Sequence, residues 1–132
     1  MNKSQQIVLI TGGSSGIGLA LAKKFIENDN TVIITGRNLQ KLEAVQRDFP
    51  QIHFFQSDVT DDADVRKLAD DINQQFRGID VLVNNAGIMN LIDAGNERND
   101  LHKQMQEIEI NYNSPIRVLH YFLPQLKNSK NA

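Results

Sequence analysis

The chain is predicted to adopt an α/β fold in which helices cover both faces of a doubly wound parallel sheet, making three layers. Short apolar runs alternate with amphipathic segments, which is typical of right-handed βαβ units. The first run, residues 7–10, is apolar at every position, as expected for a parallel strand that is buried on both faces. The sequence contains no linker and no internal repeat, so residues 1–132 are expected to form a single domain.

Three further strands and three helices are expected in the first two thirds of the chain. The strands cover residues 31–35, 52–56 and 80–83. The first helix begins in a glycine-rich segment and ends near Asn28. The second is capped by Asn38 and ended by Pro50, and the third is capped by Asp61 and closed by Gly78.

The last third of the chain is expected to be a loop followed by a long helix. Residues 90–100 are polar and predict the loop, and helical spacing resumes at about Leu101 and continues to Leu126. Pro115 lies inside this stretch and should kink or divide it, and the polar tail, residues 128–132, is expected to fray. A doubly wound sheet normally has about six strands, so the sequence is interpreted as one truncated after about four strands and the fifth helix.

Composition argues against several classes of protein. The formal net charge is −2, which provides no basic field for nucleic acid or an anionic membrane. The chain has no cysteine, and His53, His102 and His120 are too scattered for a metal-binding spacing. The apolar run near the N-terminus is too short for a signal peptide or a membrane span. The sequence therefore predicts a cytoplasmic protein with no metal, nucleic-acid or membrane partner.

The first strand is followed directly by the glycine-rich segment TGGSSGIG, within which a helix opens. Gly12 permits the tight turn, Gly16 lets the backbone approach a pyrophosphate, and Gly18 lets the helix pack near the sheet. The free N–H groups and the dipole at the helix start favour a diphosphate, and the hydroxyls of Ser14 and Ser15 can add donors. The position between strand and helix distinguishes this segment from an ordinary turn. It predicts a partial dinucleotide-binding domain of the Rossmann type.

The end of the second strand bears on which dinucleotide is bound. NAD-binding domains usually carry a carboxylate there for the ribose hydroxyls. This sequence instead has Gly36 and Arg37. Gly36 supplies no carboxylate, whereas the Arg37 guanidinium can hold a 2′-phosphate by two parallel hydrogen bonds. NADP is therefore favoured, with NAD as the alternative if Arg37 is only a solvated surface residue.

Two further turns follow strands of the predicted sheet. Asp58-Val59 comes after the third strand, and NNAG, residues 84–87, comes after the fourth. Asn-Asn-x-Gly alone is an ordinary turn sequence. Because open α/β sheets bind ligands at the carboxyl ends of their strands, both turns beside the glycine-rich segment favour one ligand site.

The segments TGGSSGIG, GRN, DV and NNAG, in this order and spacing, resemble the N-terminal half of a short-chain dehydrogenase/reductase across essentially the whole chain. NNAGI and IEINYNSPIRV give a closer likeness to the DltE-type oxidoreductases. The resemblance implies an NADP-dependent oxidoreductase that transfers hydride between the cofactor and a carbonyl or alcohol substrate. It implies that the diphosphate is bound by Gly12, Ser14, Gly16, Ile17 and Gly18, and the 2′-phosphate by Arg37. It places the adenine at Asp58 and Val59, and the ribose and the approach to the nicotinamide at Asn85, Ala86 and Gly87. It gives Asn111 the role of holding a water of the proton relay.

The rest of the family's catalytic set has no counterpart in this sequence. Carbonyl reduction needs a proton donor at the developing alkoxide, and the family uses a Tyr with a Lys four residues later, and an upstream Ser. The two tyrosines, Tyr112 and Tyr121, are followed at that spacing by Ile116 and Gln125. Residues 1–132 are therefore expected to be inactive alone, as an N-terminal fragment or a truncated gene product.

Two alternatives to an enzyme fragment remain open. The chain could be a non-catalytic dinucleotide sensor, or an interaction protein with an idle cofactor site, which the intact glycine-rich segment disfavours. Self-association is also expected, because the strand at 81–83 would present an unpaired edge and the last helix would lack part of its packing surface. In the family this helix commonly joins subunits, so a homo-oligomer is implied.

Overall fold

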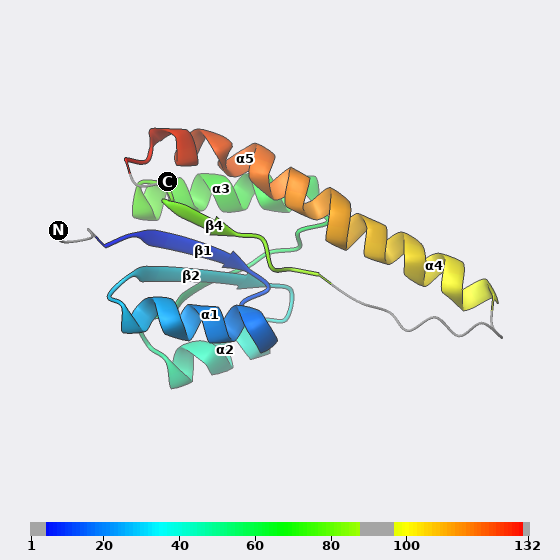
Figure 1. Cartoon of the computed structure of the whole chain (residues 1–132), viewed down its shortest axis with the longest axis horizontal. Coiled ribbons are helices and arrows are strands. Elements are labelled where there is room, and N and C mark those ends of the chain that lie inside the picture. Colours follow the sequence, from blue (N-terminus) through cyan, green and yellow to red (C-terminus); the bar gives the residue numbers. More distant parts are fainter. Residues whose placement is uncertain (1–4, 88–96, 131–132) are drawn as a thin grey trace.

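The computed structural model describes residues 5–87 and 97–130, which form a central sheet between two helical layers (Figure 1). Within these residues the strands are β1 (Ile7–Thr11), β2 (Thr31–Gly36), β3 (His53–Gln56) and β4 (Val81–Val83). The helices are α1 (Gly16–Glu27), α2 (Leu39–Asp48), α3 (Asp62–Phe76), α4 (Glu97–Ile108) and α5 (Ser114–Asn128), and a π-helical turn, η1 (Glu109–Asn113), joins the last two.

All four strands run parallel, in the order β3-β2-β1-β4. The chain moves outward from β1 to β3 and then returns to place β4 on the other side of β1. The point at which the strand order reverses, between β1 and β4, is where doubly wound sheets bind their ligands. The predicted three-layer, Rossmann-type fold is confirmed.

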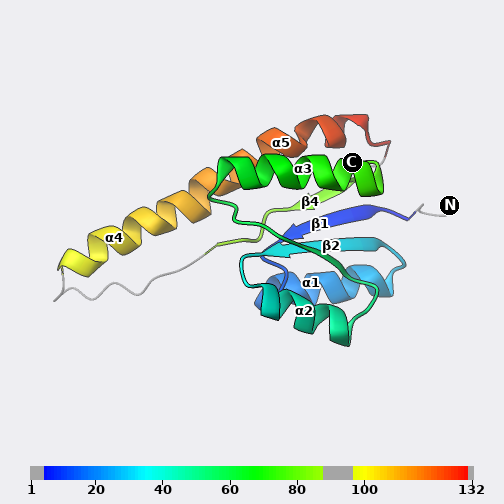
Figure 2. The ribbon, with the colours of Figure 1, turned by 180° about the vertical axis from the view of Figure 1, so that it is seen from behind.

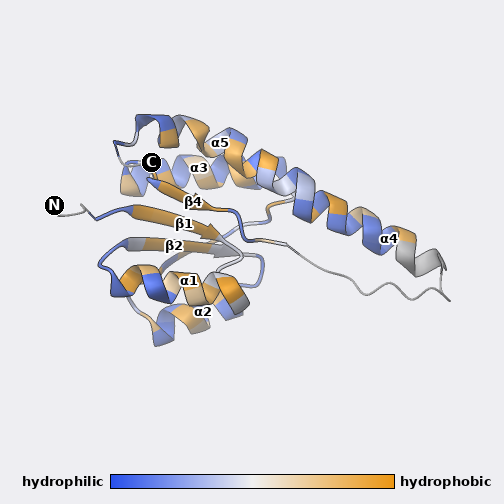
Figure 3. Cartoon of the chain, in the orientation of Figure 1, coloured by the Kyte–Doolittle hydropathy of each residue, from blue (hydrophilic) through white to orange (hydrophobic). Residues whose placement is uncertain are grey.

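Side chains along the buried strands alternate between the two faces of the sheet, and this creates two separate cores. Leu9 and Ile33 point to one face and pack with α3 and α5, and Phe122 of α5 is completely buried among them. Ile10 and Ile34 point to the opposite face and pack with α1 and α2. The view from behind shows the same two helical layers (Figure 2). The hydropathy colouring shows apolar strands between helices that carry both apolar and polar residues (Figure 3).

The predicted caps of α2 and α3 are present. Asn38 Oδ1 accepts a hydrogen bond from the Lys41 N–H at 3.2 Å, and Asp61 Oδ1 accepts one from the Asp64 N–H at 3.2 Å. Each bond satisfies one of the N–H groups that the first turn of a helix leaves without a partner. The caps thus stabilise the starts of the two helices that follow β2 and β3.

The end of α3 is close to the prediction. The helix ends before Gly78, whose φ is 110°, but Arg77 also takes a left-handed conformation with φ of 65°. The Arg77 N–H donates to the Asn73 carbonyl at 3.0 Å. A left-handed arginine was not indicated by the sequence.

The start of the long helix differs from the prediction. Residues 97–100 are helical, so the expected loop over residues 90–100 is wrong in its last four positions, and its first part lies outside the described residues. Glu97 and Arg98 are good helix formers in spite of their polarity. α4 projects well past the end of the sheet (Figure 1).

Of the kink or division expected at Pro115, the division is absent, because Asn113 and Ser114 both keep right-handed helical backbone angles and the helical stretch continues through them. η1 ends at Asn113, and Pro115 lies in the first turn of α5, so the residue that lacks an N–H comes directly after the π-helical turn. Pro124, which the sequence analysis did not single out, lies inside α5 without ending it. No helix in the described parts of the chain is long and apolar enough to cross a membrane.

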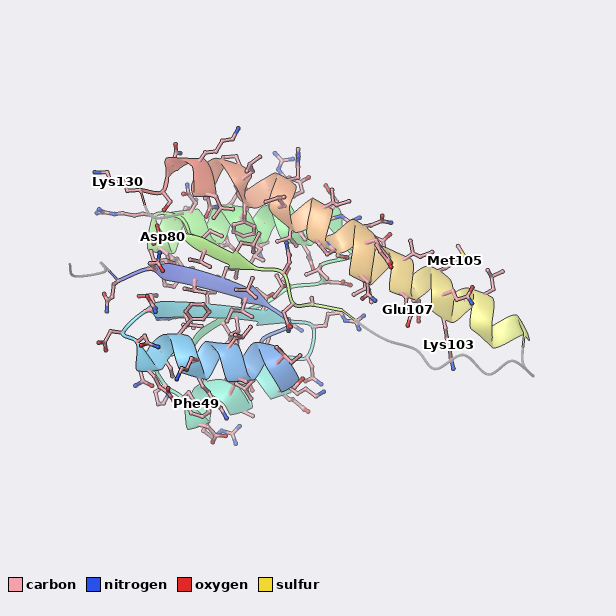
Figure 4. The ribbon with its side chains drawn as sticks, viewed as in Figure 1. Phe49, Asp80, Lys103, Met105, Glu107 and Lys130 are labelled. Carbon is pink, nitrogen blue, oxygen red and sulfur yellow. The ribbon has the colours of Figure 1, made fainter. Side chains whose placement is uncertain are left out.

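The opposite end of the sheet, at the amino ends of the strands, is tied together by Asp80, which is labelled in Figure 4. Its carboxylate accepts a hydrogen bond from the Ile7 N–H at 2.8 Å and another from the Ser129 hydroxyl. The expectation that the tail frays from residue 128 is therefore wrong for Ser129, because a side chain far away in the sequence holds it. Residues 131–132 lie outside the described part.

Candidate functional site

A cleft of about 960 Å³ opens at the carboxyl ends of the strands. Its walls are formed by the turns that follow all four strands and by Ile110 of η1. The parallel sheet brings these turns together, because every strand ends at the same edge. The predicted site residues that line the cleft are Gly12, Ser14, Ser15, Arg37, Asp58, Val59, Asn85, Ala86 and Gly87.

Four predicted site residues lie beside this cleft instead of in its walls. Gly16 and Ile17 open α1, and Ile17 is 73% exposed. Gly18 is buried beneath the glycine-rich turn. Asn111 lies on η1, with its Oδ1 2.9 Å from the position that a Cβ on Gly87 would occupy. Asn111 therefore borders the NNAG turn from the helical side.

The first turn of α1 has the features of an anion site. Ser15 is extended and makes no side-chain capping bond with the helix. The N–H groups of the first turn therefore lack the usual side-chain cap, and the helix dipole favours negative charge there. Gly16 has φ of 58°, and a Cβ built on it would meet nothing within 4 Å. The backbone is open to a ligand at this position.

Two glycines let the glycine-rich turn pack directly on its surroundings. A Cβ on Gly18 would lie 2.4 Å from the Gly12 carbonyl oxygen and 2.5 Å from Asn85 Nδ2. A Cβ on Gly13, a residue to which the sequence analysis gave no role, would lie 2.4 Å from Ile34 Cγ2. The close approach predicted for Gly18 is present, and Gly13 makes a second one.

Thr11, at the end of β1, is a residue that sequence reasoning missed. Its Oγ1 accepts hydrogen bonds from the Asn85 N–H at 3.0 Å and the Ala86 N–H at 3.1 Å. Asn85 Nδ2 in turn donates to the Gly12 carbonyl at 3.1 Å. The NNAG turn and the glycine-rich turn are thus joined by three hydrogen bonds. The only sequence signal for Thr11 is a hydroxyl at the last position of an apolar strand.

Two cationic side chains line the cleft beyond β2. Arg37 follows the strand directly, and Lys41 lies on the first turn of α2. Gly36 is the last residue of β2, and a Cβ there would have only ordinary contacts, the nearest at 3.5 Å to Leu42. This part of the cleft therefore carries positive charge, with no carboxylate at position 36.

Asp58 is held in one orientation by its own loop. Its Oδ1 accepts hydrogen bonds from the Thr60 N–H at 2.9 Å and from Thr60 Oγ1 at 2.7 Å. Partial burial acts to raise the pKa of Asp58, but the two Thr60 hydrogen bonds and the charges of Arg37 and Arg117 outweigh it and hold the pKa below its usual value. The carboxylate is an acceptor at neutral pH and suits a ligand with N–H donors.

Metal binding has no support in the described residues. No group of three or more His, Cys, Asp or Glu side chains is close enough there to hold an ion. The charged residues of the cleft are separated among different turns instead.

A doubly wound sheet with a glycine-rich turn at its switch point defines the Rossmann class of proteins. Within that class, the chain belongs to the short-chain dehydrogenase family, whose model matches residues 6–132. Members of this family are oxidoreductases that bind nicotinamide dinucleotides. The resemblance inferred from the sequence is confirmed.

Individual relatives agree with this membership. The chain is 39% identical over 132 residues to the uncharacterized oxidoreductase DltE of Bacillus subtilis (strain 168), covering all of this chain and 52% of that protein. It is 35% identical over 124 residues to serine 3-dehydrogenase of Agrobacterium fabrum, covering 93% of this chain and 49% of that protein. The chain thus spans about half the length of these relatives.

A solved structure extends the comparison to three dimensions. The active-site complex of Pseudomonas aeruginosa RhlG with NADP superposes with a TM-score of 0.88 at 25% sequence identity. The match covers 96% of this chain and 50% of RhlG. The sheet and its helical layers are therefore those of a short-chain dehydrogenase.

Proposed function

We propose that this chain is the cofactor-binding part of an NADP-dependent short-chain oxidoreductase. The enzyme would transfer hydride between NADP(H) and a carbonyl or alcohol substrate in the cytoplasm. The observation that carries the proposal is the pair of cations, Arg37 and Lys41, that lines the cleft beside a glycine at position 36. Arginine matches the geometry of a phosphate, whereas a ribose hydroxyl is usually bound by a carboxylate.

The diphosphate would bind at the start of α1. Gly16 leaves the space for it, and the uncapped N–H groups of Ile17 and Gly18 supply donors. The hydroxyls of Ser14 and Ser15, both in the cleft wall, can add further hydrogen bonds. The backbone N–H groups provide most of this attraction, so the glycines matter more here than any side chain.

The adenosine would lie between the turns after β2 and β3. Arg37 would hold the 2′-phosphate, with Lys41 adding a second positive charge. The ionised Asp58 would accept a hydrogen bond from the adenine amino group, beside the backbone of Val59. NADP binding in the solved RhlG complex supports the choice of NADP over NAD.

The nicotinamide half would extend toward the NNAG turn and η1. Asn85, Ala86 and Gly87 would line the ribose and the approach to the ring, and Asn111 would hold a water for proton transfer. The close position of Asn111 against Gly87 supports this pairing of roles. Nicotinamide supplies hydride chemistry once it is bound, and these residues orient it and handle the proton.

Turnover needs a proton donor that residues 1–132 do not include, since neither Tyr112 nor Tyr121 has a Lys four residues later. We therefore propose that these residues alone bind the dinucleotide without reducing a substrate. The same observation favours, as a second candidate, a dinucleotide sensor without chemistry. A Tyr-x-x-x-Lys encoded downstream of residue 132 would exclude the sensor.

Calorimetric titration of the chain with NADPH and with NADH tests the cofactor assignment. NADPH is expected to bind more tightly, because only NADPH carries the phosphate for Arg37 and Lys41. Both affinities should be modest, since much of the nicotinamide contact surface lies outside these residues in the proposal. Equal affinities for NADPH and NADH would refute the NADP assignment, and absence of binding of either would refute the dinucleotide site.

A further inference from the structure

Arg117 lies behind the wall of the cleft, in the first turn of α5. Its side chain is 20% exposed, and its guanidinium contacts two segments that are far apart in the sequence. Nη1 donates a hydrogen bond to the Val59 carbonyl at 2.8 Å, and Nη2 donates one to Glu109 Oε1 at 3.0 Å. Arg117 itself is not in the cleft wall, so it acts on the cleft through these contacts and through the charge that it adds near Asp58.

The two partners belong to two different segments beside the cleft. Val59 lies in the wall between Asp58 and Thr60, in the turn after β3. Glu109 is the first residue of η1, whose next residue, Ile110, lines the cleft and is followed by Asn111. A single guanidinium therefore connects the turn after β3 with the π-helical turn.

Glu109 is fixed across η1 by two bonds of its own. Its Oε2 accepts a hydrogen bond from Asn113 Nδ2 at 2.9 Å, and its carbonyl accepts one from the Ser114 hydroxyl at 2.9 Å. π-Helical turns are rare and are frequently found at functional sites. Here the turn has a specific external contact, because its first side chain is paired with Arg117.

The chemistry of arginine suits this double contact. Its planar fork presents several N–H donors in fixed directions, so one guanidinium can bond a carbonyl and a carboxylate together. Asp62 at the start of α3 adds a carboxylate 4.0 Å from Nε and is itself bonded by the Tyr121 hydroxyl. Lysine carries only a point charge and cannot reproduce the same set of bonds.

We propose that Arg117 is a positioning residue that fixes the turn carrying Asp58 and Val59 against η1, so that these two segments of the cleft wall keep a constant spacing. The hydrogen bonds of Arg117 alone support the connection between the two segments. Its consequence for the cofactor rests on the function proposed above. In that setting Arg117 would align the adenine contact with the Asn111 end of the site.

Hydrogen exchange in the unliganded chain tests the connection without any cofactor. In Arg117→Met, the amides of Thr60 and Asn111 are expected to exchange together about tenfold faster or more, as for loss of a bond to a charged group. Amides of β1 and α1 should not change. Arg47→Met on the exposed end of α2 is the matched control. A change in one segment without the other, or in neither, would overturn the proposal.

Two further variants keep the test decisive. Glu109→Gln retains the shape of the side chain and removes its charge. If Arg117→Met does not fold, amide exchange at Thr60 and Asn111 in Glu109→Gln tests the connection in its place. Arg117→Lys keeps the charge but not the fork. It is expected to resemble Arg117→Met in exchange at Thr60 and Asn111, and wild-type exchange in Arg117→Lys would contradict a geometric role.

A thermodynamic cycle measures the effect on binding. Arg117→Met is expected to weaken NADPH binding about tenfold, but by clearly less when Asp58→Asn is already present, because Arg117 acts through that turn. Additive effects would indicate general destabilisation and would overturn the positioning role. If wild type binds no dinucleotide, the proposed function fails, while the exchange experiment still decides whether Arg117 connects the two segments.

Discussion

Thr11 is the last residue of β1, Asn85 lies in the turn after the neighbouring parallel strand β4, and Thr11 Oγ1 accepts a hydrogen bond from the Asn85 N–H at 3.0 Å. The same oxygen accepts the Ala86 N–H at 3.1 Å. One buried hydroxyl thus satisfies two backbone donors of a turn that lines the cleft. The position of the NNAG turn depends on a residue that is not part of it.

Replacing Thr11 with Val should destabilise the protein by about 1–3 kcal/mol, because two amides lose their acceptor while the side-chain shape is kept. Urea unfolding measures the loss. Thr35→Val is the matched control: Thr35 is paired with Thr11 in the sheet and fully buried, yet its Oγ1 has no hydrogen-bond partner among the described residues. Thr35→Val should be neutral or stabilising, and equal losses in the two variants would refute the role of Thr11.

The sequence predicted the parts of the site that are encoded locally. The glycine-rich segment, Arg37, Asp58 and NNAG each follow a strand, and parallel topology places all strand ends at one edge. The structure brings these turns together in one cleft, as expected. Their roles toward a cofactor stay predictions.

Residues whose roles depend on tertiary contacts were not predicted. Thr11 matters because β4 returns beside β1, and Arg117 matters because α5 packs near the turn after β3. Neither relationship leaves a periodic or spacing signal in the sequence. The helical start at Glu97 was missed for a different reason, since polar residues predict a loop and a solvated helix equally well.

Changing Arg37 to Asp should reverse the cofactor preference from NADPH toward NADH. The carboxylate would repel the 2′-phosphate and could accept hydrogen bonds from ribose hydroxyls. Lys41→Gln should weaken NADPH binding less, because it removes charge without adding repulsion. Calorimetry with both dinucleotides measures the change. An unaltered preference for NADPH in Arg37→Asp would show that Arg37 does not bind the 2′-phosphate.

Gly18→Ala should destabilise the chain by about 1–3 kcal/mol through overpacking. The added Cβ would lie 2.4 Å from the Gly12 carbonyl oxygen, a backbone atom that cannot easily move. Dinucleotide binding should fall as well, since the glycine-rich turn would shift. Gly36→Ala is the control, because its Cβ would come no closer than 3.5 Å to another atom. Similar losses in thermal stability for the two variants would contradict this account.

Stability should fall in acid partly because Glu109 gains its proton. Hydrogen bonds from Asn113 and Arg117 outweigh desolvation and hold the pKa of Glu109 below its ordinary value of 4.5. A depressed carboxyl pKa gives stability that is present above the unfolded pKa and is lost as pH falls through the folded one. The melting temperature of Glu109→Gln should therefore depend less on pH below about 4.5 than that of wild type. The exposed Glu43→Gln is the control, and parallel profiles for all three proteins would count against the prediction.

Self-association is expected through an apolar face that runs along α4, η1 and α5. Met105 is 61% exposed, Tyr112 67% and Ile116 69%, and Met105 lies on the part of α4 that projects past the sheet (Figure 4). Exposed apolar side chains in a continuous row favour burial against another surface. Ile116→Glu should therefore shift the species seen by light scattering toward monomer.

The control for this experiment is Gln75→Glu, which adds the same charge on the exposed side of α3. β4 offers a competing surface, since it pairs only with β1 among the described strands and so presents an open edge. Association that persists in Ile116→Glu would show that the face around Ile116 is not required, and would leave the open strand edges of the sheet as the contact. A wild-type chain that stays monomeric at high concentration would refute self-association by either surface.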